Sequence, residues 1–157
     1  MNGRPVVLLL SGPNLNLLGE REPALYGTDN LAAHVKRAQV RAREHGMDVE
    51  HVQSNGELAL VEAVHGARGR TTAIVVNAGA LTHYSWSLSD ALAAYDGVVV
   101  ELHLTNPAAR EPWRHLSVVA PVADGTIAGF GGLGYELAMD AVARLLEARD
   151  VSPGTVT

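Results

Sequence analysis

The feature that most constrains the fold is an alternation of short apolar runs with segments of helical periodicity. Five runs rich in aliphatic and β-branched residues have the length of a strand: Val6–Leu10, Val49–Gln53, Ala73–Val76, Val98–Leu102 and Val118–Val122. Such runs predict strands. Because several of them are continuously apolar and helix-like segments separate them, the pattern indicates a parallel sheet that is covered on both faces.

Apolar side chains recur at helical spacing in four other segments: Leu31 to Ala42, Val61 to Ala67, Leu88 to Tyr95 and Tyr135 to Ala148. Asp29–Asn30 before the first segment, and Ser85 or Ser87 before the third, are candidate N-caps. We therefore expect an α/β fold with three layers, α/β/α, built on a flavodoxin-like, doubly wound sheet of five parallel strands.

Length and composition favour a single domain, residues 1–157, because 157 residues with 47% hydrophobic side chains are enough for one core. The net charge of -5 and the lack of a Lys/Arg run argue against nucleic-acid binding. No apolar stretch approaches the roughly 20 residues of a membrane span, and no signal peptide is evident. With no cysteine, we expect a cytoplasmic protein. We expect its tail, about 149–157, to be disordered.

Polar chemistry gathers where three of the predicted strands end. GPNLNLLGEREPALYG, residues 12–27, follows the first strand; NAGALTHYS, residues 77–85, follows the third; ELHLTNPAAREPWRH, residues 101–115, closes the fourth. In doubly wound sheets, ligands bind beyond the carboxyl ends of the strands. We therefore expect these three stretches to contribute to one site.

Glu101 and His103 are a candidate acid and its orienting group. Alternation along a strand places both side chains on the same side of the sheet. There the carboxylate can orient the imidazole and favour its protonated form. This arrangement suits a general acid.

Tyr26 is the candidate base. A tyrosine can act as a base at neutral pH when a neighbouring guanidinium in a closed site favours its ionised form, and Arg21 lies in the same segment. The segment is also long for a connector. With Gly19 and Gly27 as hinges, we expect residues 20–27 to form a mobile lid that carries the base.

Other common site motifs are absent from the sequence or lack their context. Residues 129–134 read GFGGLG and match GxGxxG, but no strand follows to carry the acidic residue of a dinucleotide site. We expect this turn to allow tight packing between a strand and the last helix. The sequence has no HExxH or similarly spaced ligand set, no P-loop and no GxSxG. We expect neither a cofactor nor a metal ion.

Taken together, the motifs resemble those of the type II 3-dehydroquinate dehydratases. GPNLNLLGEREPALYG, NAGALTHYS, ELHLTN, AREPWRH and GFGGLGYELA occur in that family's order over residues 6 to about 145. The resemblance implies a flavodoxin-like domain assembled as a dodecamer of trimers. It also implies a trans elimination of water from 3-dehydroquinate that gives 3-dehydroshikimate and needs no cofactor or metal.

The resemblance further implies roles for individual residues. Tyr26 matches the base that removes a proton from C2, and Arg21 matches the cation beside it. His103 matches the acid that protonates the leaving C1 hydroxyl, with Glu101 as its orienting carboxylate. Asn14 matches the residue that holds a water against the developing enolate oxygen. The matched substrate contacts are Asn77, His83, Leu104, Thr105, Arg114 and, reaching in from a neighbouring subunit, Asp90.

Several positions depart from the family's usual pattern. A Thr replaces the usual Ser at Thr105, which keeps the hydroxyl, and we expect Arg110 to be structural. No position that we assign to proton transfer is altered. Two alternatives stay open: a paralogue that dehydrates amino-dehydroquinate in secondary metabolism, or a non-catalytic flavodoxin-like binding protein. The departures that could change substrate or assembly are Ala78, Leu81, Tyr84, Gly56 and Ala108.

Overall fold

The computed structural model describes residues 3–151 and contains one five-stranded sheet in the order β2-β1-β3-β4-β5. Every neighbouring pair of strands is parallel. The strands are β1 (Val6–Ser11), β2 (Asp48–Gln53), β3 (Ala73–Asn77), β4 (Val98–His103) and β5 (Gly125–Ala128). This is the flavodoxin-like, doubly wound order that the sequence predicts.

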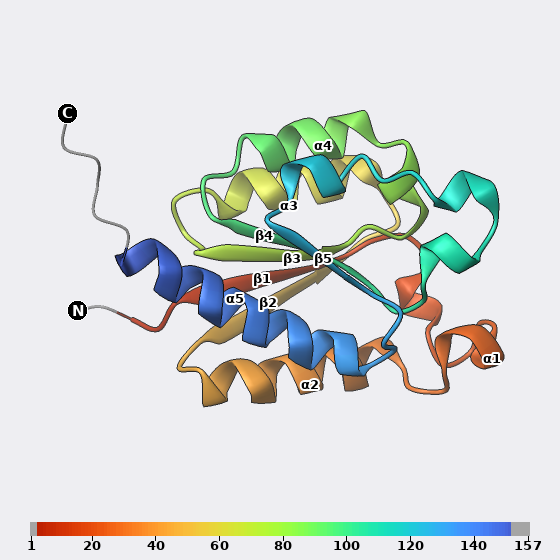
Figure 1. Ribbon diagram of the computed structural model, residues 1–157, viewed down its shortest axis with the longest axis horizontal. Coiled ribbons are helices and arrows are strands. Elements are labelled where there is room, and N and C mark those ends of the chain that lie inside the picture. Colours follow the sequence, from red (N-terminus) through yellow and green to blue (C-terminus); the bar gives the residue numbers. More distant parts are fainter. Residues whose placement is uncertain (1–2, 152–157) are drawn as a thin grey trace.

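Four longer helices cover the sheet. Helices α2 (Leu31–Glu44) and α5 (Leu133–Val151) pack on one face, and α3 (Glu57–Ala67) and α4 (Trp86–Ala93) pack on the other, so the molecule has three layers (Figure 1). Helix α1 (Pro23–Tyr26) has a single turn. Short 3-10 helices complete the connections: η1 (Leu15–Leu17), η2 (Gly79–His83), η3 (Pro107–Ala109), η4 (Pro112–Arg114) and η5 (Ala120–Val122).

The sequence patterns explain why these elements form. All five residues of β3 and the first five residues of β4 are buried, as expected for central strands that helices cover on both faces. The predicted N-caps are confirmed, because the Asn30 side chain accepts a hydrogen bond from the Ala33 amide at 2.9 Å and the Ser85 hydroxyl accepts one from the Leu88 amide at 3.2 Å. Within residues 3–151, no helix is long and apolar enough to cross a membrane.

The predicted fifth strand is wrong. Val118 and Val119 are buried, but they lie in a connection, and residues 120–122 form η5. Pro121 has no backbone N–H and so suits a turn better than a paired strand. The fifth strand is Gly125–Ala128, a four-residue edge strand whose first two residues are exposed. Its composition gave no apolar run from which it could be predicted.

The end of the chain also differs from the prediction. Helix α5 starts at Leu133 and continues to Val151, so residues 149–151 of the predicted disordered tail are helical. The remainder of that tail, residues 152–157, lies outside the described residues.

The glycine-rich turn packs tightly between β5 and α5, as predicted. A Cβ on Gly134 would lie 2.9 Å from the Leu102 side chain on β4. Gly129 has a φ of 94°, a conformation that other residues rarely adopt. The turn therefore lets α5 approach the sheet closely.

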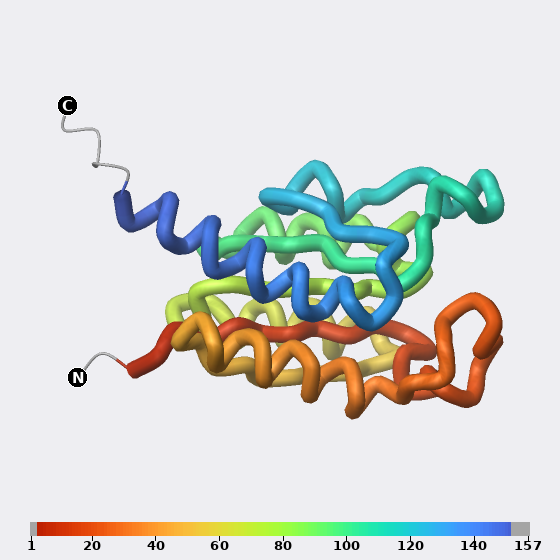
Figure 2. The backbone as a smooth tube through the Cα atoms, turned by 60° about the horizontal axis from the view of Figure 1, so that its bottom comes forward, coloured from red at the N-terminus to blue at the C-terminus, as the bar shows by residue number. Residues whose placement is uncertain are grey.

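Segments that leave β1 and β4 project from the same end of the sheet. In Figures 1 and 2, the part of the chain that contains α1 and the part that contains η3 and η4 lie at one end of the molecule, although they are far apart in sequence. These are the carboxyl ends of the parallel strands, where a ligand site is expected.

Candidate active site

A cavity of about 70 Å³ lies at the carboxyl ends of β1, β3 and β4. Each of the three polar stretches singled out from the sequence contributes to its walls. The predicted site residues that line it are Asn14, Arg21, Tyr26, Asn77, His83, His103, Leu104, Thr105 and Arg114. The topology thus brings nine of the eleven predicted residues together.

The other two predicted residues lie outside this cavity. Glu101 is 1% exposed and sits behind His103. Asp90 is exposed on α4 and is not among the residues that line the cavity. In the single chain, Asp90 therefore has no place in the site.

His103 is held by the buried carboxylate of Glu101. The His103 imidazole donates from Nε2 to Glu101 Oε2 at 2.9 Å, which leaves Nδ1 available for another partner. Burial raises the pKa of Glu101, but hydrogen bonds from His103 and Ser117 outweigh this effect, and the pKa is lowered overall. The ionised carboxylate orients the His103 imidazole, and a histidine oriented in this way can serve as a general acid.

Tyr26 is flanked by two cations. The guanidinium carbons of Arg21 and Arg110 each lie 5.3 Å from the centre of the Tyr26 ring. Tyr26 is the last residue of α1, a turn that begins with Pro23 and follows Glu22, which has a φ of 40°. The two guanidinium groups thus place positive charge on both sides of the sequence-predicted base.

Arg110 is a further residue of the cavity, which sequence reasoning did not place there. We expected it to be structural, but its side chain is only 13% exposed, lines the cavity and donates from Nη1 to Thr105 Oγ1 at 3.3 Å. One signal could have revealed it. Three arginines fall in the segments that follow β1 and β4, although the chain has a net charge of -5.

Two further polar groups of the cavity, His83 and Arg114, are held by their own partners. His83 donates from Nδ1 to the Leu116 carbonyl at 2.7 Å, so its Nε2 remains available for a ligand. Arg114 donates from Nε to Glu111 at 2.6 Å and lies over the Trp113 ring at 4.0 Å. These contacts fix an imidazole nitrogen and a guanidinium at the wall of the cavity.

Asn14 and Asn77 supply amide groups. Asn14 has a φ of 68°, in the left-handed region that Asn tolerates better than most residues. Asn77, at the end of β3, is 4% exposed and accepts a hydrogen bond from the Gly79 amide at 3.2 Å. Within residues 3–151, no group of three or more His, Cys, Asp or Glu residues is arranged to hold a metal ion.

The fold and this site define a flavodoxin-like α/β protein that carries a tyrosine and a histidine, each with charged partners, at the carboxyl end of its sheet. A family model described as "Dehydroquinase class II" matches residues 5–143. The chain therefore belongs to the class II dehydroquinase family, as its motifs suggested.

Individual relatives agree with this assignment. The chain is 52% identical over 146 residues to a 3-dehydroquinate dehydratase of Desulforudis audaxviator, an alignment that covers 93% of this chain and 97% of the relative. It is 47% identical over 146 residues to 3-dehydroquinate dehydratase 2 of Pseudomonas putida, with 93% and 98% covered. A crystal structure of the type II dehydroquinase from Propionibacterium acnes superposes with a TM-score of 0.86 at 40% identity, covering 92% of this chain and 99% of that one.

Proposed function

We propose that the protein is a hydro-lyase that dehydrates 3-dehydroquinate to 3-dehydroshikimate by trans elimination. Membership of the class II dehydroquinase family supports the reaction. Its relatives in Desulforudis audaxviator and Pseudomonas putida carry the name 3-dehydroquinate dehydratase. The observation that carries the proposal is that Tyr26, flanked by two arginines, and His103, bonded to a buried carboxylate, line the same cavity.

In the proposed mechanism, the ionised hydroxyl of Tyr26 removes a proton from C2 of the substrate. The C2–H bond electrons form an enolate, whose oxygen is stabilised by a water held by Asn14. As the enolate collapses, the C1–O bond breaks and His103 gives its proton to the departing hydroxyl, which leaves as water. Glu101 orients His103, and Arg21 and Arg110 favour the ionised base.

The remaining cavity residues bind the substrate in this proposal. The substrate is a ring with a carboxylate and several hydroxyl groups. The backbone of Leu104 and Thr105 and the Thr105 hydroxyl supply neutral hydrogen-bonding groups for the substrate. Arg114 supplies a cation in the same cavity. Asn77 and His83 provide hydrogen-bonding groups for ring hydroxyls.

Residues 20–27 act as a lid in this proposal. The cavity volume of about 70 Å³ is well below the ~300–1,000 Å³ typical of ligand pockets, so entry of a ring requires part of the wall to move. Gly19 and Gly27, with φ values of 91° and 84°, flank the segment.

We treat residues 1–157 as one catalytic domain. We place it in the cytoplasm because the chain lacks cysteine.

Five of the positions that depart from the family pattern lie away from the cavity, which favours 3-dehydroquinate over an amino analogue as the substrate. Ala78 and Leu81 are buried in the core between the sheet, α3 and α4. Tyr84 is 60% exposed, Gly56 precedes α3, and Ala108 lies in η3. None of these five described residues lines the cavity. We therefore expect a higher kcat/KM with 3-dehydroquinate than with amino-dehydroquinate, and the reverse order would favour the paralogue.

Assembly as a dodecamer of trimers is a further part of the proposal. Asp90 lies on the exposed side of α4, and the chain also exposes aromatic residues that a neighbouring copy could cover: Tyr84, Trp86 and Trp113. Twelve 16.6-kDa chains would give a particle of about 200 kDa. Light scattering coupled to gel filtration measures this mass directly, and a monomer would contradict the assembly.

The decisive experiment measures formation of the conjugated enone product by ultraviolet absorbance in wild-type protein and in Tyr26→Phe. We expect turnover by the wild type and a loss of at least about 1,000-fold in kcat in the variant, because the variant lacks the base. Ligand binding by Tyr26→Phe, followed by calorimetry, should persist. If the folded wild type binds 3-dehydroquinate without converting it, the alternative of a non-catalytic binding protein is favoured.

A further inference from the structure

The carboxylate of Glu101 lies in an unusual environment for a charged group. It is on β4, it is 1% exposed, and it accepts a hydrogen bond from His103 at 2.9 Å. A buried carboxylate is stable as an anion only when hydrogen bonds replace the lost water. The groups that donate those bonds therefore determine both the charge and the direction of this side chain.

Ser117 is the closest of those donors. Its hydroxyl lies 2.7 Å from Oε2 and 3.0 Å from Oε1 of Glu101. The Ser117 oxygen accepts hydrogen bonds from the Val119 amide at 3.1 Å and the Ala120 amide at 2.9 Å. Because the two amides donate to both lone pairs of the Ser117 oxygen, the hydroxyl can interact with the carboxylate only as a donor.

Glu101 also borders a second cavity. This rear cavity, of about 230 Å³, has a lining that includes Glu101, His103, Ser117 and Thr82. Glu101 is nevertheless only 1% exposed. Hydrogen bonds from neighbouring side chains, and not water, therefore set the direction of its carboxylate.

We propose that Ser117 is a positioning residue for the acid: it holds the Glu101 carboxylate ionised and directed at His103. The role of His103 as acid rests on the proposed function. Ser117 itself touches neither the substrate cavity nor the reacting atoms, because it lines only the rear cavity. It acts through Glu101.

Other groups around Glu101 contribute less to this arrangement. The Thr126 hydroxyl, on β5, donates to Oε1 at the longer distance of 3.3 Å. The other titratable groups that line the rear cavity are His83, Arg114 and His115, and no hydrogen bond joins these described residues to Glu101. After His103, Ser117 is the strongest influence that lowers the pKa of Glu101. Its removal should therefore raise this pKa.

The test compares Ser117→Ala with Thr82→Val and Ser117→Thr. The Thr82 hydroxyl lines the same rear cavity, but it is buried without a hydrogen-bond partner among the described residues, so Thr82→Val is a matched control. We expect Ser117→Ala to lower kcat by about 10- to 100-fold with KM changed less than twofold. The acid limb of its pH profile should move to higher pH, because Glu101 is protonated more easily. Ser117→Thr keeps the hydroxyl and should restore most of the activity.

A second measurement does not depend on turnover. Carbon-13 NMR of labelled Glu carboxyls follows the titration of Glu101 directly, and we expect the Glu101 resonance to titrate at higher pH in Ser117→Ala than in wild type or Thr82→Val. An unchanged titration, or an equal loss of kcat in Thr82→Val, would overturn the inference. If the wild type lacks dehydratase activity but the titration still shifts, the proposed function fails while the positioning of Glu101 stands.

Discussion

Arg110 lies against the ring of Tyr26 at the same distance as Arg21, 5.3 Å from the ring centre. Arg21 could be assigned from sequence because it is close to Tyr26 along the chain and lies in the same motif. Arg110 belongs to the segment after β4, and only the packing of that segment against α1 brings it to the ring. A single chain thus places two cations beside one tyrosine.

Replacement of Arg110 tests this arrangement. We expect Arg110→Gln to lower kcat by about 10-fold, since one unit of positive charge near the tyrosinate is lost and solvent screens part of its effect. KM should change less than kcat, because the cation acts on the base. Steady-state kinetics with 3-dehydroquinate measure both parameters.

Arg43→Gln is the control for this experiment. Arg43 is a 64% exposed side chain on α2 that pairs with Asp48, and its loss should leave kcat unchanged. An Arg110→Gln variant with wild-type kcat would show that Arg21 alone supports the base, and Arg110 would return to the structural role expected from the sequence.

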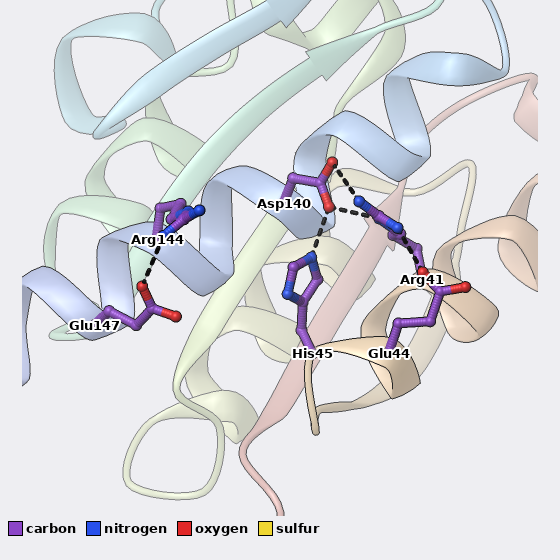
Figure 3. Close-up of polar contacts among 6 residues, drawn as sticks. All are labelled: Arg41, Glu44, His45, Asp140, Arg144 and Glu147. Atoms are coloured by element: carbon purple, nitrogen blue, oxygen red, sulfur yellow. Dashed lines mark hydrogen bonds and ion pairs between the residues drawn. The ribbon is translucent and has the colours of Figure 1, made fainter.

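At the scale of elements, the α2–α5 pair is joined by polar contacts that no local pattern predicts. Asp140 on α5 accepts hydrogen bonds from Arg41 Nε at 2.6 Å and from His45 Nε2 at 2.6 Å, both at the C-terminal end of α2 (Figure 3). A hydrogen bond from Arg41 is the largest influence on the pKa of Asp140, which is lowered. A lowered carboxyl pKa adds stability that is present above the usual Asp range and is lost as the pH falls through the folded-state value.

The contacts of Asp140 with Arg41 and His45, here called the Asp140 network, predict that two substitutions on α5 have unequal effects on thermal stability. Asp140→Asn should lower the melting temperature by about 2 °C or more, because it weakens a link between two helices. Glu147→Gln removes a pair with Arg144 inside one helix, also drawn in Figure 3, whose side chains are 66% and 83% exposed. It should have almost no effect.

Thermal denaturation at low and high salt measures this difference. Screening should reduce the effect of Asp140→Asn, since its origin is electrostatic. Equal effects of the two substitutions would show that the Asp140 network contributes no more than an ordinary surface pair.

At the scale of the whole molecule, stability should depend on pH through buried histidines. His34 on α2 is 2% exposed, stacks on Tyr135 of α5 with ring centres 4.9 Å apart, and has no hydrogen-bond partner at either ring nitrogen among the described residues. Burial, together with the nearby charge of Arg37, lowers its pKa. The pKa of His51 is also lowered by burial.

The sign of the pH dependence follows from these lowered values. The unfolded chain takes up protons at these histidines once the pH falls below about 6.5, whereas the folded protein resists protonation. Unfolding free energy should therefore decrease below that pH. Between pH 6.5 and 5.5, we expect the unfolding free energy of His34→Leu to fall by about 1 kcal/mol less than that of the wild type.

Urea denaturation across this pH range measures the effect. His65→Gln, at an exposed position on α3, is the control and should follow the wild-type dependence. Parallel curves for His34→Leu and wild type would mean that His34 does not contribute to the loss of stability in acid.

The sequence by itself determined the strands β1 to β4, the four longer helices, the flavodoxin-like order and the residues proposed for proton transfer. The strands and helices leave local periodic patterns, and residues two apart on a strand, such as Glu101 and His103, share a side. The strand order follows from the alternation of these strands and helices along the chain. Only the tertiary structure decided the position of β5, the contact of Arg110 with Tyr26 and the bonds from Ser117 to Glu101. Each of these depends on which distant segments pack together, and local periodicity carries no information about that.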